Sequence, residues 1–141
     1  MQFKKTLVFV FICLSFLACC NNDDDNQNET QEHAIHGTWN LSNVSGGFVG
    51  IDIDYNRGEV VWTFNDNNKQ LIVENNIMTT GPEQIYSGLN TGNYTYEIQE
   101  IEDTEVLYID GNTRGVISIS NTTLTIDDGV AADGFLTTFE R

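Results

Sequence analysis

Apolar and polar residues alternate along most of the chain from Gly37 onwards, in short runs separated by turn residues. In one such run, Val60, Trp62 and Phe64 all fall on the same side of an extended chain. This period of two is typical of a β-strand that is buried on one face. Eight runs of this kind follow one another along the chain. They span residues 37–44, 58–65, 69–75, 93–99, 105–110, 114–120, 122–127 and 134–141.

The spacing of these runs predicts an all-β fold, because strands that recur about every 8–12 residues are typical of sandwiches and barrels. Short turns such as 66–68 join successive runs, no window shows a sustained helical period, and Pro82 is the only proline. Successive strands joined by short turns form a meander, which closes most simply into a barrel. We therefore predict a small up-and-down antiparallel β-barrel of about eight strands over residues 36–141. The longer gaps, 45–57 and 76–91, are expected to be loops at its rim.

The side chains expected inside the barrel are large. They are Trp39, Leu41, Val60, Trp62, Phe64, Leu71, Val73, Tyr94, Tyr96, Ile98, Leu124, Ile126, Phe135 and Phe139. An eight-stranded barrel either is filled by its own side chains or holds one small ligand, and the sequence leaves both interpretations open. The side chains expected to line a pocket are Trp62, Phe64, Tyr94, Tyr96, Phe135 and Phe139. Tyr94 and Tyr96 offer both a ring and a polar group to a ligand, although tyrosines of the core or rim are the simpler interpretation.

Residues 1–18 have the layout of a secretory signal peptide. Lys4 and Lys5 precede a run of thirteen uncharged, mostly apolar residues, 6–18. A positive segment followed by a short apolar segment directs export, whereas a membrane-spanning helix needs about 20 apolar residues. We therefore expect an exported mature protein without a transmembrane helix.

All three cysteines lie in the first twenty residues, so the predicted barrel contains no internal disulfide. A cysteine that follows an apolar leader and a small residue resembles the lipobox of bacterial lipoproteins. The resemblance implies cleavage before this cysteine and its modification by acyl chains such as palmitate, which together give lasting membrane attachment. Ala18 precedes Cys19 and favours it as the lipidated residue. Cys20, with Leu17 three positions before it, is the alternative, and Cys13 is an apolar residue of the leader.

Residues 19–35 are expected to form a lipidated acidic tether, disordered because so polar a segment cannot bury apolar area. In lipoproteins, an aspartate directly after the lipidated cysteine retains the protein at the inner membrane. That position is Cys20 or Asn21 here, which favours the outer membrane. The acidic cluster at 21–25 resembles the surface-export signal of one Gram-negative phylum, which favours display at the cell surface. A simple solvated tether is the alternative, and the two are compatible.

The net charge excludes one class of partner. The chain has 21 acidic and 6 basic side chains, a formal charge of −15, and loss of the leader's two lysines moves this charge to −17. The cations that remain are Arg57, Lys69, Arg114 and Arg141. Binding to phosphate backbones needs a basic patch, so we expect no nucleic-acid partner.

The two ends of the predicted barrel resemble the lipocalin-like domains of bacterial lipoproteins. The first strand begins with Gly37-Thr38-Trp39, and the last strand ends with Phe139-Glu140-Arg141. In lipocalins, a G-x-W on the first strand closes one end of the barrel, and a basic residue of the last strand packs across the tryptophan. The resemblance implies the same pairing of Trp39 with Arg141. Antiparallel pairing of the first and last strands would independently bring these two residues together.

A calcium site is a weak possibility near Asp52, Asp54 and Asn56, since alternating acidic oxygens can converge on a hard cation. An EF-hand loop starting at Asp52 would need glycine at its sixth position and glutamate at its twelfth, but Arg57 and Thr63 stand there. A solvated loop is the better interpretation, and no metal ion or other cofactor is expected.

No constellation of catalytic residues is evident. His33 and His36 lie before the predicted first strand, and no histidine or cysteine follows His36. Residues 45–48, SGGF, do not form the G-x-S-x-G of hydrolases, and carboxylates are too numerous in this chain to indicate a glycosidase pair. We therefore expect no enzymatic activity.

The leading functional hypothesis is a membrane-anchored lipoprotein whose lipocalin-like barrel binds a small apolar or amphipathic molecule. The alternative is an interaction module with a solid core, which docks a protein or polysaccharide through the rim loops 45–57 and 76–91. A third hypothesis, an inhibitor that presents a loop to a periplasmic enzyme, has no specific loop signature to support it.

Overall fold

A computed structural model of the chain describes residues 35–141. The predicted leader, nearly all of the predicted tether, and both candidate lipidation residues, Cys19 and Cys20, lie outside this range. The strands are β1 (Gly37–Gly46), β2 (Ile51–Asp54), β3 (Val60–Asn65), β4 (Gln70–Asn75), β5 (Gly92–Ile101), β6 (Thr104–Ile109), β7 (Asn112–Ile119), β8 (Thr123–Asp127) and β9 (Phe135–Glu140). Two short helices, α1 (Pro82–Tyr86) and the 3₁₀ helix Val130–Ala132, lie between strands.

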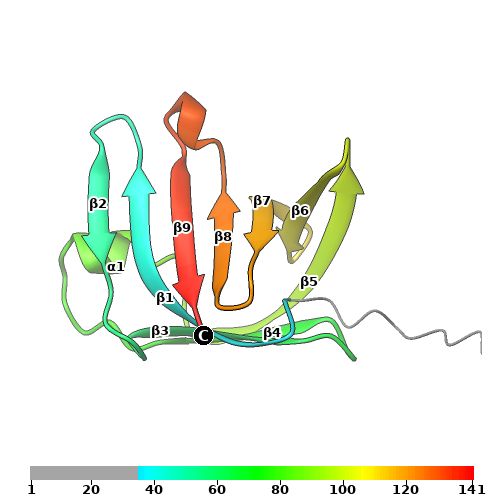
Figure 1. Cartoon of the computed structure of the whole chain (residues 1–141). Helices are drawn as coiled ribbons and strands as arrows, with labels where there is room; N and C mark the ends of the chain where they lie inside the picture. The colour runs from blue at the N-terminus through cyan, green and yellow to red at the C-terminus, as the bar shows by residue number, and fades with distance from the viewer. Residues whose placement is uncertain (1–34) are drawn as a thin grey trace, which may run out of the picture. The chain divides into compact units, whose positions relative to one another are not determined.

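All strands except β2 form one closed antiparallel barrel in the order β1-β3-β4-β5-β6-β7-β8-β9, and β9 returns to β1 (Figure 1). Strand β1 closes it by changing partners along its length. Its first half pairs with β3, with Trp39 opposite Trp62, and its second half pairs with β9, with Leu41 opposite Phe139. The prediction of an all-β, eight-stranded up-and-down barrel is therefore confirmed.

Two segments predicted to be plain loops contain regular structure. The segment 45–57 contains β2, a ninth strand that lies along the second half of β1 (Figure 1). The segment 76–91 contains α1, which begins at Pro82 directly after Gly81 and lies near β2. Both elements escaped prediction because four or five residues are too few to show a clear hydrophobic period.

The barrel interior is filled over most of its length. Of the fourteen side chains predicted to face inward, eleven are buried, while Tyr94, Ile98 and Phe135 are half-buried and pack against them. The core also includes Ile35, Val44, Tyr55, Leu107, Ile109 and Ile117. Strand β6 gave no clean pattern in the sequence, since the adjacent residues Val106 and Leu107 are both buried.

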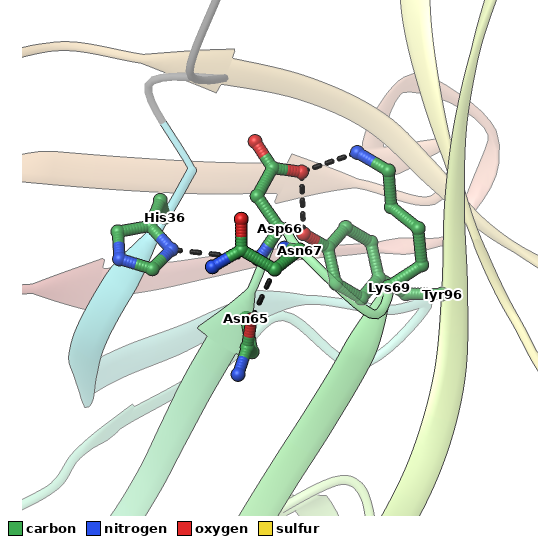
Figure 2. A network of polar contacts seen from close by, with 6 residues as sticks. All are labelled: His36, Asn65, Asp66, Asn67, Lys69 and Tyr96. Atoms are coloured by element: carbon green, nitrogen blue, oxygen red, sulfur yellow. Dashed lines mark hydrogen bonds and ion pairs between the residues drawn. The ribbon is translucent and has the colours of Figure 1, made fainter. Parts of the chain in front are cut away.

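A polar network ties the start of the barrel to the β3–β4 turn (Figure 2). The Tyr96 hydroxyl donates a hydrogen bond of 2.9 Å to Oδ1 of Asp66, and Lys69 forms an ion pair with the same carboxylate. The backbone N–H of Asp66 donates to Nδ1 of His36 at 3.4 Å. Burial and the hydrogen bond to Asp66 raise the pKa of Tyr96, so this hydroxyl is held as a donor.

Candidate functional site

A cavity of about 220 Å³ lies at one mouth of the barrel. Its walls come from the ends of β1 and β8, the beginning of β7, the middle of β3, strand β9, and α1 with the segment that follows it. The lining residues are Val44, Trp62, Ile85, Tyr86, Ser87, Gly88, Leu89, Arg114, Ile126, Asp128, Phe135, Thr137 and Phe139. The interior therefore combines a packed core with a small pocket at this mouth.

Two pairs of aromatic rings form much of the lining. The rings of Trp62 and Phe139 have centroids 4.7 Å apart, and those of Tyr86 and Phe135 lie 5.5 Å apart. Both pairs are tilted, with interplanar angles of 45° and 51°. An apolar cavity of about 150 Å³ is large enough to bind benzene, so this cavity has room for one ring with a short substituent.

The structure brings together half of the residues predicted to line a pocket. Trp62, Phe135 and Phe139 line the cavity. Phe64 does not line it, because its ring lies fully buried between Trp62, at 6.0 Å, and Tyr96, at 5.0 Å.

The two predicted tyrosines also lie away from this cavity. Tyr94 donates its hydroxyl hydrogen to the backbone oxygen of Asn90 at 2.8 Å. Tyr96 donates to Asp66 and lines a separate hollow of about 160 Å³. The polar groups of both tyrosines are therefore used within the protein.

Arg114 is a charged lining residue that the sequence did not reveal. In β7, Ile117 and Gly115 are buried, so strict alternation would place Arg114 on the outer face. The β6–β7 register shifts at this point, because Leu107 pairs with Gly115 whereas Tyr108 pairs with Thr113. Arg114 is thus the extra residue of a β-bulge, a feature that commonly redirects a side chain. The bulge is what allows the guanidinium to reach the cavity.

Glycine makes this bulge possible. Gly115 has φ of +138°, and a Cβ there would lie 2.3 Å from the backbone oxygen of Asp127. A glycine inside a strand pattern is a recognised sign of a bulge or a close backbone approach. This was the one signal in the sequence that could have pointed to Arg114.

Two residues of the cavity lining each have a buried polar atom that lacks a hydrogen-bond partner. These atoms are Nε1 of Trp62 and Nε of Arg114. Every other buried side-chain nitrogen or oxygen in residues 35–141 has a hydrogen-bond partner. An unsatisfied buried donor costs about 1–3 kcal/mol, and such groups call for an explanation. By contrast, Nε1 of Trp39 donates to the backbone oxygen of Ile35 at 2.7 Å. Both unpartnered atoms are donors, so the group that would satisfy them is an acceptor.

The cavity also has a defined charge distribution. Arg114 is half-buried, whereas Arg57, Lys69 and Arg141 are exposed. Within the described residues, Arg114 forms no ion pair or hydrogen bond. Asp128 contributes a carboxylate to the lining, and this carboxylate accepts a hydrogen bond from the backbone N–H of Phe135. One cation and one anion therefore share the lining without pairing.

The weak metal candidates form hydrogen bonds with neighbouring side chains. Oδ1 of Asp52 and Oδ1 of Asp54 both accept hydrogen bonds from Nδ2 of Asn43, at 2.8 and 2.9 Å. Asn56 donates from Nδ2 and from its backbone N–H to the carboxylate of Glu59, and these bonds lower the pKa of Glu59. From residue 35 onwards, no three His, Cys, Asp or Glu side chains are grouped as metal ligands.

From residue 35 to residue 141, no helix has the length and apolar character needed to cross a membrane. No protein-family model, curated protein or solved structure matches the chain.

Proposed function

We propose that this protein is a membrane-anchored lipoprotein whose lipocalin-like barrel binds one small amphipathic molecule, without catalysis. The observation that carries the proposal is the cavity, whose aromatic walls suit an apolar body and whose two unpartnered donors suit a polar end. Apart from the described barrel, the proposal includes acylation of Cys19, or of Cys20, and attachment to the outer membrane with the barrel exposed at the cell surface. The leader and lipobox-like residues support this part.

The contact between Trp39 and Arg141 supports the lipocalin-like assignment. Cζ of Arg141 lies 3.9 Å from the centroid of the Trp39 ring. Trp39 lies in β1 and Arg141 directly follows β9, and the pairing of these two strands closes the barrel. The domain has no histidine or cysteine after His36, so the cavity offers neither of these groups for catalysis.

Native mass spectrometry of the mature protein, purified from its host in lipid nanodiscs, tests the binding role. We expect a bound small molecule that organic extraction releases for identification. Thr137→Phe should abolish loading, because Thr137 lines the cavity and a phenyl ring would fill it. Thr138→Phe, on the opposite face of the same strand, is the matched control and should stay loaded. Repeated recovery of empty wild-type protein would refute the binding role.

A second candidate function is supported by the exposed apolar side chains of the two rim segments. Phe48 and Val49 in 45–57 are 87% and 78% exposed, and Met78 and Ile85 in 76–91 are 96% and 74% exposed. A hydrogen bond of 2.9 Å from the Tyr55 hydroxyl to the backbone oxygen of Glu83 connects the two segments. Exposed apolar groups of this kind suit a docking surface for a protein partner.

Surface cross-linking in living cells tests this candidate. If the rim segments dock a partner, the double variant Phe48→Ser, Val49→Ser should lose its cross-linked product. The control Val116→Ser alters a similarly apolar residue of a barrel strand, 41% exposed, and should keep the product. An unchanged product in the rim variant would exclude docking through Phe48 and Val49.

A further inference from the structure

We propose that the cavity selects ligands that carry a carboxylate, which is held by the Nε1–H of Trp62 and the Nε–H of Arg114. The proposal rests on the proposed function, ligand binding in this cavity, and adds the chemical class of the ligand. It follows from the two unpartnered donors and from the arrangement of charge around them.

The first step is that the missing group is an acceptor. Trp62 is 4% exposed, and its indole nitrogen is a donor only. Arg114 likewise offers donors and no acceptor. Within residues 35–141, these two atoms are the buried side-chain polar atoms without a partner, and both residues line the same cavity. A ligand that brings oxygen acceptors would satisfy both.

The second step is that the acceptor is charged. The guanidinium of Arg114 is always protonated, and its planar arrangement of donors matches a carboxylate. It forms no ion pair within the described part of the chain. Hydrogen bonds with an ionised partner are roughly twice as strong as neutral ones, so a carboxylate is favoured over an alcohol or an amide of the same size.

The third step is that the ligand is a monoanion. Asp128 places a second carboxylate in the lining, and this carboxylate repels an anion in proportion to the anion's charge. A phosphate carries nearly two negative charges, so Asp128 would repel it about twice as strongly as it repels a carboxylate, which carries one.

The size and walls of the cavity define the rest of the ligand. A volume of about 220 Å³ accommodates one ring with a short acidic arm. The rings of Trp62, Tyr86, Phe135 and Phe139 favour an aromatic or compact apolar body. An arylalkyl carboxylate satisfies all these features.

Phenylacetate and 2-phenylethanol are suitable probes, since they share the ring and the arm length and differ in the charged group. Calorimetry on the mature lipoprotein in nanodiscs, with empty nanodiscs subtracted, should show phenylacetate binding about tenfold or more tightly than 2-phenylethanol. Arg114→Gln should remove this preference. Arg57→Gln makes the same change at an exposed arginine and should retain it.

The two indole N–H resonances give a second readout. Phenylacetate should shift the indole N–H resonance of Trp62, which the Trp62→Phe variant assigns. The indole N–H resonance of Trp39 should stay unchanged, because this group already donates to the backbone oxygen of Ile35. Equal binding of the two probes, a preference that survives Arg114→Gln, or a shift confined to Trp39 would overturn the carboxylate inference. The failure of both probes to bind would also overturn it. The native mass spectra decide the ligand-binding role separately, because they do not depend on either probe.

Discussion

The guanidinium of Arg141 packs over the indole ring of Trp39, with Cζ 3.9 Å from the ring centroid. Trp39 is completely buried, whereas Arg141, which packs on its ring, is exposed. The arginine therefore lies between the ring and water. The two residues lie near the start of β1 and just after β9, the strands whose pairing closes the barrel. A cation over an aromatic face therefore stabilises the junction on which closure depends.

Replacement of Arg141 by alanine should destabilise the barrel more than replacement of Arg57. Loss of the stacked guanidinium is expected to cost about 0.5–2 kcal/mol, whereas Arg57 is an exposed residue whose replacement should have a much smaller effect. Thermal unfolding of the two variants, followed by circular dichroism, measures the difference. Equal shifts in Tm would show that the contact with Trp39 contributes nothing to closure.

Gly115→Ala should be strongly destabilising, by about 3 kcal/mol or more, because the new Cβ would lie 2.3 Å from the Asp127 backbone oxygen. Gly111→Ala is the matched control in the same hairpin. Gly111 also has positive φ, +74°, but a Cβ there meets nothing within 4 Å, so only the backbone strain of about 1–2 kcal/mol applies. Urea denaturation of both variants measures the two costs. A control that loses as much stability as Gly115→Ala would contradict the close-packed bulge.

The barrel was predictable because its signal is repeated. Most of the eight barrel strands show the same alternation, and a pattern that recurs at short intervals leaves few possible architectures. The observed register of β1 with β9 places Leu41 opposite Phe139, two residues of the predicted inward set.

The cavity was less predictable because it depends on departures from that pattern. A bulge turns Arg114 inward against the alternation of β7, and α1 with the residues after it adds a wall where only a loop was expected. Whether Tyr94 or Tyr96 faces a ligand depends on which hydrogen bonds their hydroxyls form, and these partners, Asn90 and Asp66, are set by turns rather than by strand period.

Cys19→Leu should abolish metabolic labelling with a palmitate analogue, whereas Cys20→Leu should retain it. The reason is that Ala18, a small residue, stands directly before Cys19, while Cys19 itself would occupy that position before Cys20. Leucine is chosen because serine at position 19 would place a small residue directly before Cys20. Labelled protein is detected by gel fluorescence after immunoprecipitation. The reverse outcome would assign the anchor to Cys20. If both single variants and the double variant were all labelled, neither cysteine would be the anchor.

Stability should fall as pH rises from about 10 towards 12, and Tyr55 should contribute to that fall. Burial, followed by the charges of Glu83 and Glu59, raises the pKa of Tyr55 from 10.0 to about 12. Between these values the unfolded state has lost the phenolic proton while the folded state keeps it, so each increment of pH favours unfolding. Below pH 10 both states keep the proton, and the full stabilising contribution of Tyr55 is present.

Urea midpoints measured from pH 8 to pH 11 should decline less steeply in Tyr55→Phe than in wild type. The Tyr55→Phe midpoints should start lower, because this variant lacks the hydrogen bond to the Glu83 backbone oxygen. Parallel pH profiles for the two proteins would show that Tyr55 ionises normally in the folded barrel.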